Sequence, residues 1–200
     1  MIIPSHNRSF LLKRAIQSVF DQTYSELECI VVNDASIDET DQIINSFEDD
    51  RLKYFRNKEK KGASAARNIG IEKSKGDLIA FLDDDDEWMP TKLEKQVSLI
   101  QNLPKLFGLV YCWMDYINDK GNIIHEHHPI LRGNVFSQVL DAQRLGGCPT
   151  LLVRREVCED VRGFDESLLR GNDGDFIRRV CKKYKVDLIP EVLVKVYTGH

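Results

Sequence analysis

The sequence has 200 residues, of which 42% are hydrophobic and 30% charged, a balance typical of a soluble globular protein that excludes a disordered tail. The formal net charge of −4 gives no overall attraction for nucleic acid, so we expect no nucleic-acid partner. No stretch reaches the roughly 20 apolar residues that a membrane-spanning helix requires.

The five cysteines are widely spaced and form no C-x-x-C pair. This pattern favours reduced, buried thiols over a disulfide framework or a zinc site. The opening residues are also too short an apolar run for a signal peptide. Together these features predict a cytoplasmic protein.

Strand and helix patterns alternate along the first half of the chain. Strands are predicted at residues 2–3, 27–32, 52–55 and 78–82, and helices at 11–20, 36–47, 63–74 and 90–100. The second helix is expected to open with a capping box from Ser36 to Glu39, and the fourth to hold Pro90 in its first turn. This alternation predicts an α/β fold with a doubly wound, mostly parallel sheet flanked by helices.

The second half is less regular. Strands are predicted at residues 106–114, 151–153, 186–189 and 192–197, a turn at 118–122 and a helix at 176–184. No internal repeat or clear linker divides the sequence. We therefore predict one domain over residues 1–200, with a mixed second half.

Polar residues interrupt the pattern where three predicted strands end, at residues 4–8, 33–36 and 83–86. In open parallel sheets, ligands bind beyond the carboxyl ends of the strands, so we expect the three clusters to meet at one site. Helix capping is an alternative explanation, and we prefer it for Asp38, Glu39 and Asp86.

The third cluster consists of four consecutive aspartates directly after an apolar strand. Like charges a few ångströms apart repel by about 1–4 kcal/mol per pair. A divalent cation with oxygen ligands relieves this repulsion, and Mg²⁺ or Mn²⁺ commonly joins one or two carboxylates to ligand phosphates. The position of the run favours a metal site over a solvated loop.

These clusters belong to a longer ordered series of motifs. The segments are residues 2–8, 22–24, 30–36, 62–68, 79–88, 163–166 and 172–173, followed by the terminal His200. The series resembles the inverting, family-two glycosyltransferases of the GT-A fold, and it covers nearly the whole chain. The resemblance implies a Rossmann-like GT-A fold with a nucleotide-sugar-binding half at 1–103 and an acceptor-binding, catalytic half at 104–200.

The resemblance also implies how the donor, a UDP-sugar, is bound. Its base and ribose slot would be lined by Pro4, Ser5, His6 and Asn7. Asp34 would accept a hydrogen bond from the imide N–H of uracil, and Arg67 would lie near the pyrophosphate. For Arg67 alone, an ordinary exposed helix arginine is the competing interpretation.

Metal binding is assigned in the same way. Asp85 would bind Mn²⁺ or Mg²⁺ directly, while Asp83 or Asp84 would contact the ribose or a metal-bound water, with Asp83 as the first residue of the D-x-D motif. His200 resembles a histidine that approaches the metal from the C-terminal strand. The histidines at residues 125, 127 and 128, beside the turn predicted at 118–122, are expected to be solvated.

Asp173 matches the general base of the family, which removes the proton from the acceptor hydroxyl. Gly147, Cys148 and Asn172 are expected to bind the acceptor. The family usually has Glu at the position of Asn172, which puts the acceptor or sugar preference in question. A second departure is the first strand, cut to residues 1–3, which is consistent with a piece of a longer protein.

The expected acceptor is a saccharide or a lipid-linked saccharide, in cell-surface polysaccharide synthesis, with peripheral association at the inner face of the cell membrane. One alternative is a sugar nucleotidyltransferase, but residues 4–8 lack the glycine-rich, basic loop that would hold a triphosphate. Another is a relative that binds nucleotide sugar or glycan without turnover, which the Asn172 substitution supports. Donor hydrolysis by the purified protein tests the non-catalytic alternative, and pyrophosphate release from a triphosphate and a sugar phosphate tests the nucleotidyltransferase.

Overall fold

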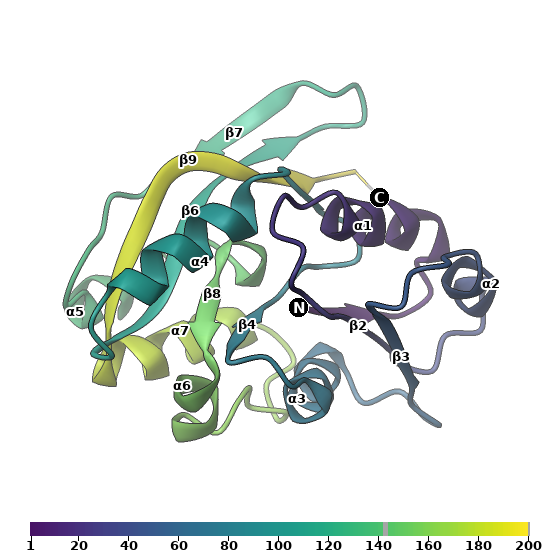
Figure 1. The fold of residues 1–200 in the computed structure, drawn as a ribbon, viewed down its shortest axis with the longest axis horizontal. Helices are drawn as coiled ribbons and strands as arrows, with labels where there is room; N and C mark the ends of the chain where they lie inside the picture. The colour runs from purple at the N-terminus through teal and green to yellow at the C-terminus, as the bar shows by residue number, and fades with distance from the viewer. Residues whose placement is uncertain (142–143, 200) are drawn as a thin grey trace.

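The computed structural model describes residues 1–141 and 144–199 and follows the predicted alternation of strands and helices in the first half (Figure 1). The strands are β1 Ile2–Ser5, β2 Cys29–Asn33, β3 Leu52–Arg56, β4 Leu78–Ala80, β5 Glu87–Trp88, β6 Phe107–Ile117, β7 Ile123–His127, β8 Leu152–Arg154 and β9 Lys185–Tyr197. The helices are α1 Ser9–Phe20, α2 Thr40–Asn45, α3 Ala63–Lys73, α4 Lys92–Asn102, α5 Phe136–Val139, α6 Arg155–Asp160 and α7 Asn172–Lys183, with a 3-10 turn, η1, at Cys148–Thr150. None of the described helices is long and apolar enough to cross a membrane.

The first sheet is parallel and has the order β1-β2-β3. Helices α1 and α2 cover one face and α3 covers the other (Figure 1). Ile3 and Val31 pack in the cluster that contains α1, whereas Ile2 and Ile30 pack in the cluster that contains α3. Because both faces are covered, β1 and β2 are buried along their whole length, whereas the edge strand β3 is only partly buried.

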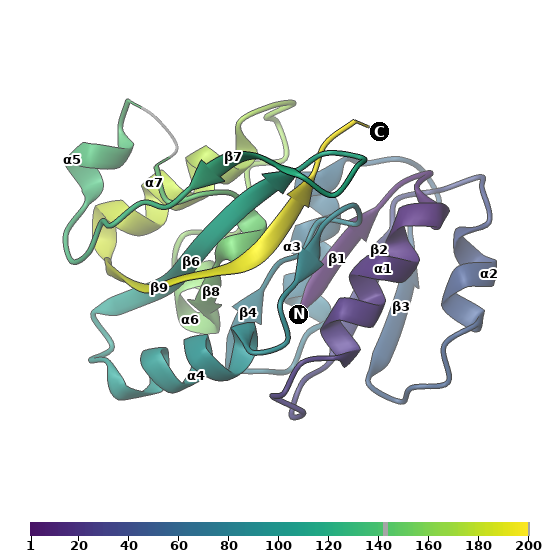
Figure 2. The same ribbon diagram turned by 90° about the horizontal axis from the view of Figure 1, so that it is seen from above.

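The second sheet is mixed, with the order β4-β8-β6-β9-β5 and β7 paired to β6. It adjoins the first sheet at a single parallel bridge between Ile2 and Phe81, just after β4. Helix α4 contributes Val97 to the cluster on one face, and α7 contributes Ile177 to the cluster on the other. Figure 2 shows β9 running beside β6 along the length of this sheet. The predicted α/β fold with a mixed second half is confirmed.

Two local expectations were wrong, and one short strand was missed. Residues 186–189 and 192–197 form one strand, β9, because its pairing with β6 continues past residues 190–191 through a shift in register. Helix α4 begins at Lys92, two residues after Pro90, whose carbonyl instead accepts the backbone N–H of Thr23 at 2.9 Å. Strand β5 was not predicted, because a strand of two residues shows no periodicity in the sequence.

The capping box predicted at Ser36 does not form. The Ser36 hydroxyl accepts the N–H of Asn7 at 3.0 Å, and its own N–H donates to Asn33 Oδ1 at 2.7 Å. Helix α2 therefore begins at Thr40, whose N–H and hydroxyl both donate to Asp38 Oδ1. Asp38 thus contacts the first residue of α2 but is not its N-cap, which is Glu39 and has no side-chain capping bond, while Ser36 serves the loops at the ends of β1 and β2.

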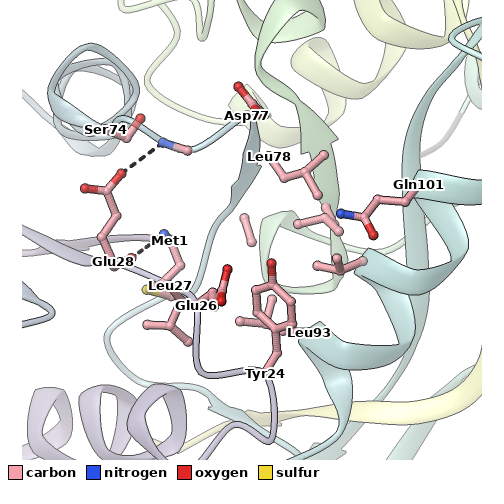
Figure 3. Close-up of a pocket in the computed structure, with 14 residues that line it drawn as sticks. Met1, Tyr24, Glu26, Leu27, Glu28, Ser74, Asp77, Leu78, Leu93 and Gln101 are labelled. Carbon is pink, nitrogen blue, oxygen red and sulfur yellow. Dashed lines mark hydrogen bonds between the residues drawn. The ribbon is translucent and has the colours of Figure 1, made fainter.

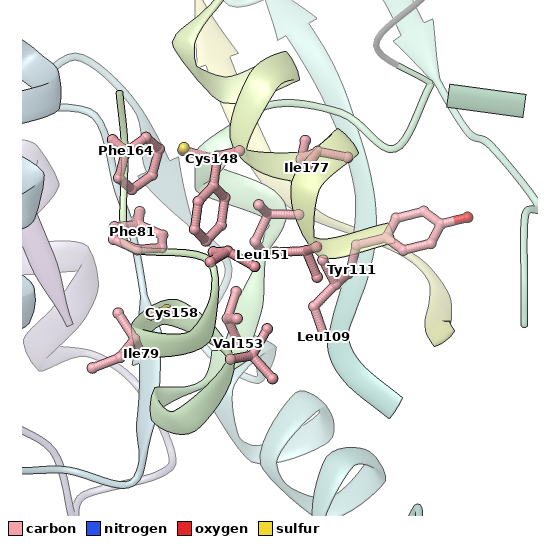
Figure 4. Close-up of a cluster of buried hydrophobic side chains, with 14 of the residues drawn as sticks. Ile79, Phe81, Leu109, Tyr111, Cys148, Leu151, Val153, Cys158, Phe164 and Ile177 are labelled. Atoms are coloured by element: carbon pink, nitrogen blue, oxygen red, sulfur yellow. The ribbon is translucent and has the colours of Figure 1, made fainter. Parts of the chain in front are cut away.

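The core beneath the second sheet is aromatic around η1. Phe164 stacks on Phe176 with ring centroids 4.4 Å apart, and Phe81 meets Phe164 edge to face at 5.2 Å. Figure 4 shows Cys148 beside this group. All of the cysteines in the sequence are buried free thiols, as their spacing predicted.

Candidate active site

The three polar clusters predicted at strand ends meet at one pocket of about 390 Å³. It is lined by Pro4, Ser5, His6 and Arg8 after β1, Asp34 after β2, Lys60, Gly62, Ala63, Ala66 and Arg67 around α3, and Asp83, Asp84 and Asp85 after β4. We call it the donor-side pocket. Asn7 lies outside this lining, and its side-chain oxygen accepts the N–H of Ile37 at 2.8 Å.

Asp34 is buried at the back of the donor-side pocket. Its carboxylate accepts hydrogen bonds from the Asn57 side chain at 2.8 Å and from the N–H groups of Lys61 at 2.9 Å and Gly62 at 2.7 Å. These contacts order the loop that leads into α3. Since a carboxylate has about four accepting positions and three are used, Asp34 keeps about one for a ligand.

The four aspartates after β4 point to different partners. Asp83 pairs with Arg67 at 2.6 Å, Asp84 and Asp85 both pair with Arg8, and Asp86 accepts the N–H of Tyr197 at 3.3 Å. Arg8 was missed as a site residue by sequence reasoning, although it lies inside the first polar cluster. The run is therefore partly neutralised within the chain.

Burial nevertheless removes water from two of these carboxylates, so their negative charge is poorly stabilised. Burial, with a further contribution from Asp85, raises the pKa of Asp84 to about 6. Burial and the neighbouring Asp83 and Asp85 raise the pKa of Asp86 well above its usual range. Carboxyl groups held in this way gain from a divalent cation, and their oxygen atoms are the ligands that Mg²⁺ and Mn²⁺ prefer.

The chemistry of these residues thus fits the predicted metal, but the structure gives no coordination geometry. Within residues 1–141 and 144–199, no three His, Cys, Asp or Glu side chains are grouped so that they could hold a metal ion. His200, the predicted third ligand, lies outside the described residues.

Arg67 joins the donor-side pocket to the predicted base. Its side chain is only 5% exposed, with Nη2 2.6 Å from Asp83 Oδ1 and Nη1 3.3 Å from Asp173 Oδ1. Burial lowers the pKa of Arg67, but the adjacent Cys148, Asp83 and Asp173 outweigh it and raise the pKa above its usual value. The competing expectation of an exposed helix arginine was wrong.

Asp173 lies in the first turn of α7 and is 18% exposed. Its Oδ2 accepts the backbone N–H of Cys148 at 2.9 Å. Asp173 lines a second pocket of about 400 Å³, which also contains Asp83, Asp86, Met114, Tyr116, His127, Gly146, Gly147, Pro149 and Val196. We call it the acceptor-side pocket. Asp83 lines both pockets, so they meet at this residue.

The predicted acceptor residues are placed differently from one another. Gly147 lines the acceptor-side pocket, but the Cys148 side chain is fully buried in the core, and burial together with Asp173 raises the pKa of its thiol. Asn172 turns its amide toward Ser64 Oγ at 3.2 Å and lines neither pocket. Cys148 contacts Asp173 through its backbone, a role that a side-chain motif does not reveal.

The histidines near the β6–β7 turn are not all solvated, which corrects the expectation for two of them. His125 is exposed, whereas His128 stacks on Trp113 and contacts Asp115 at 2.8 Å. His127 is half-buried and lines the acceptor-side pocket together with Asp173. An extended segment was expected after the turn at 118–122, but no sequence signal placed His127 in this pocket.

A further pocket of about 190 Å³ lies at the opposite ends of the strands, around Met1 and Leu78 (Figure 3). Glu28 accepts the Lys75 N–H there at 2.5 Å, and the Glu28 carbonyl accepts the Met1 amine at 2.6 Å. Its lining includes none of the residues predicted for binding or catalysis.

Comparison with known proteins identifies relatives in sequence. Residues 1–162 match the family described as Glycosyl transferase family 2. An uncharacterized glycosyltransferase of Rickettsia typhi is 33% identical over 202 residues, 98% of this chain and 62% of the relative. The Escherichia coli UDP-Glc:alpha-D-GlcNAc-diphosphoundecaprenol beta-1,3-glucosyltransferase WfgD is 39% identical over 110 residues, 54% of this chain and 44% of that protein. The chain thus spans less than two thirds of the length of either relative.

Solved structures show the same fold. S. aureus TarS 1-349 in complex with UDP-GlcNAc has a TM-score of 0.83 at 20% identity, over 100% of this chain and 58% of that chain. The mannosyltransferase PcManGT from Pyrobaculum calidifontis, in complex with GDP-Man and Mn²⁺, has a TM-score of 0.73 at 19% identity, over 97% and 55%. These likenesses confirm the predicted GT-A fold. With the family match over residues 1–162 they lead to one conclusion: the chain belongs to glycosyl transferase family 2.

Proposed function

We propose that this chain forms the donor-binding and catalytic part of an inverting glycosyltransferase. It moves a sugar from a UDP-sugar to a hydroxyl group of a saccharide or lipid-linked acceptor. The observation that carries the proposal is the junction of the two pockets at Asp83, with Asp173 on the acceptor side and the aspartate run on the donor side.

The donor-side pocket suits a nucleotide diphosphate. Asp34 stands at its back with accepting capacity left for one further donor, such as the imide N–H of uracil. UDP-Glc in the name of the E. coli relative and UDP-GlcNAc in the TarS complex support a uridine donor. The PcManGT complex holds GDP-Man, so the fold alone does not choose the base.

A divalent cation, Mn²⁺ or Mg²⁺, is part of the proposal. Asp85 and Asp83 would hold it, and bound there it would neutralise the charge that builds on the departing diphosphate. The raised pKa values of the buried neighbours Asp84 and Asp86 support this, as does the Mn²⁺ in the PcManGT complex. The terminal His200 remains a proposed ligand from the residues that the structure leaves undescribed.

Asp173 acts as the general base in the proposed reaction. It takes the proton of the acceptor hydroxyl while that oxygen bonds to the anomeric carbon of the sugar. The bond between this carbon and the diphosphate oxygen breaks, and its electron pair leaves with the diphosphate. One displacement inverts the configuration. Arg67 and the N–H of Cys148 hold the Asp173 carboxylate in place for this step.

The acceptor is proposed to enter through the acceptor-side pocket, past Gly147 and His127. The diphosphoundecaprenol acceptor in the name of the E. coli relative supports a lipid-linked saccharide. An enzyme acting on such an acceptor works at the cytoplasmic face of the cell membrane, in cell-surface polysaccharide synthesis.

Release of UDP tests the function directly. The purified protein is incubated with UDP-glucose or UDP-GlcNAc, with Mn²⁺ or with a chelator, and UDP is measured. We expect metal-dependent UDP release and tighter calorimetric binding of UDP than of GDP. UDP binding without any release would indicate a non-catalytic binding protein, and release of pyrophosphate from UTP with a sugar phosphate would indicate a nucleotidyltransferase.

A further inference from the structure

Lys92, on α4, is a fully buried lysine that the proposed reaction does not use. Its side chain has 0% exposure, which is rare for lysine outside a functional or paired setting. The amine donates to Gln96 Oε1 at 2.7 Å and lies 3.9 Å from the centroid of the Trp88 ring. It makes no ion pair with a carboxylate in the described ranges 1–141 and 144–199. Burial lowers its pKa to about 8.

This lysine determines which way the Gln96 amide points. An amine on a lysine side chain offers donors, so the Gln96 oxygen must face it. The Gln96 nitrogen is thereby directed away from Lys92, and it donates to the carbonyl of Thr150 at 2.8 Å. A methionine in place of Lys92 would leave the Gln96 oxygen without a donor and release the amide to turn.

Trp88 makes a parallel contact with the same segment. Its indole Nε1 donates to the carbonyl of Pro149 at 2.9 Å, and the Lys92 amine lies over its ring. Two successive carbonyls of η1, at Pro149 and Thr150, are thus held by side chains of β5 and α4. The Thr150 hydroxyl also closes the turn by donating to the Gly147 carbonyl at 2.8 Å.

The other side of η1 reaches the candidate base. Cys148, the first residue of the turn, donates its N–H to Asp173 Oδ2 at 2.9 Å. We propose that Lys92, Gln96 and Trp88 form a buried clamp that positions Asp173 through η1. They are positioning residues, and the inference rests on the proposed role of Asp173 as the base.

The clamp explains why a costly buried lysine occurs in an apolar layer. Burying an amine without a carboxylate partner is unfavourable, and apolar side chains of equal volume would pack the same space. The lysine supplies what they lack, a fixed orientation for Gln96. A loose η1 would displace the Cys148 N–H, and a displacement of about 1 Å at a catalytic group can cost about 10²-fold in rate.

The test compares Gln96→Leu and Trp88→Phe with Ile100→Val, a buried conservative change on the same helix α4 as Gln96. Hydrogen exchange of the Cys148 amide is measured in the free protein, and kcat and donor KM for UDP release from UDP-GlcNAc are measured with Mn²⁺. We expect both clamp variants to exchange this amide at least about 10-fold faster than the control. We also expect kcat to fall about 10-fold while the donor KM stays unchanged.

Two outcomes would overturn the clamp. One is Cys148 exchange in both variants equal to that of Ile100→Val. The other is a kcat loss that merely follows the loss of melting temperature. If the unaltered protein releases no UDP from UDP-GlcNAc or UDP-glucose, the proposed function fails instead, and hydrogen exchange still decides whether the clamp holds η1. Trp88→Phe, which keeps an aromatic ring but removes the indole N–H, serves if Gln96→Leu does not fold.

Discussion

The donor-side and acceptor-side pockets meet at Asp83, yet they are built in different ways. The donor-side pocket is built from the end of β1, the segments that follow β1, β2 and β4, and the start of α3 with the loop before it. The acceptor-side pocket draws Met114 from β6, His127 from β7, Gly147 from the approach to η1 and Asp173 from α7. The first pocket follows from the order of strands in a sheet, whereas the second depends on how separate elements pack.

The two pockets also differ in how their charges are held. The aspartates of the run that line the donor side are paired with Arg8 and Arg67, and the pKa values of Asp83 and Asp84 are still raised by burial. On the acceptor side Asp173 is held by one N–H and by the shared Arg67. We therefore expect donor-side substitutions to change binding and stability, and acceptor-side substitutions to change the rate.

The largest effect is expected for Asp173→Asn. Asparagine retains the size of the side chain but cannot accept the acceptor proton, so transfer should fall by roughly 10²–10⁴-fold. UDP affinity, measured by calorimetry, should be unchanged. Asp175→Asn, on the same helix but paired with Arg179, is the control. Full activity of Asp173→Asn, or a product that retains the donor configuration by proton NMR, would remove Asp173 from the mechanism.

Asp85→Asn tests the donor side of the junction between the two pockets. Loss of a carboxylate that holds the cation should weaken Mn²⁺-dependent binding of UDP by at least about 10-fold. The fold should remain intact, because the change also relieves repulsion within the aspartate run. Calorimetry of UDP with Mn²⁺ and with chelator is the measurement. Unchanged metal dependence would place the metal elsewhere.

Asp34→Asn should reduce UDP binding by about 1–3 kcal/mol, the cost of an unmatched hydrogen bond to a buried base. The carboxylate also orders the loop at residues 57–62, so a control must separate the two roles. Asn57→Ala loosens the same loop while keeping the carboxylate. If Asp34 recognises the base, only Asp34→Asn should lose the preference for UDP over GDP. Equal losses of UDP affinity in both variants would show that Asp34 only anchors the loop.

The smallest effect is a change in stability at Asp84. Because its pKa in the folded protein is raised to about 6, its contribution to stability is present below the ordinary pKa and is lost as pH rises through about 6. Asp84→Asn should therefore raise the free energy of unfolding at pH 7 by about 1–3 kcal/mol and have little effect near pH 3.5. Urea unfolding measures it, with the exposed Asp50→Asn as control. A pH-independent change would show that loss of the Arg8 contact dominates.

Sequence periodicity predicted the first sheet closely, because β1 and β2 are buried on both faces and helix α1 has one apolar stripe. It did not predict β5 or the unbroken course of β9, whose pairing with β6 passes the proline at residue 190. The polar clusters predicted where the donor-side pocket lies, since parallel strands bring their carboxyl ends together. The capping box at Ser36 failed because Asn7 and Asn33 compete for its side chain and backbone.

By itself the sequence determined the α/β alternation, the family resemblance and the residues at the strand ends, since these depend on neighbours along the chain. Tertiary structure decided the rest. It made Arg67 a bridge between Asp83 and Asp173, and it buried the Cys148 side chain while leaving its N–H for the Asp173 carboxylate. Such contacts join residues that lie far apart in the sequence, as Arg67 and Asp173 do, and only the packing of α3, η1 and α7 against one another brings their atoms within hydrogen-bond reach.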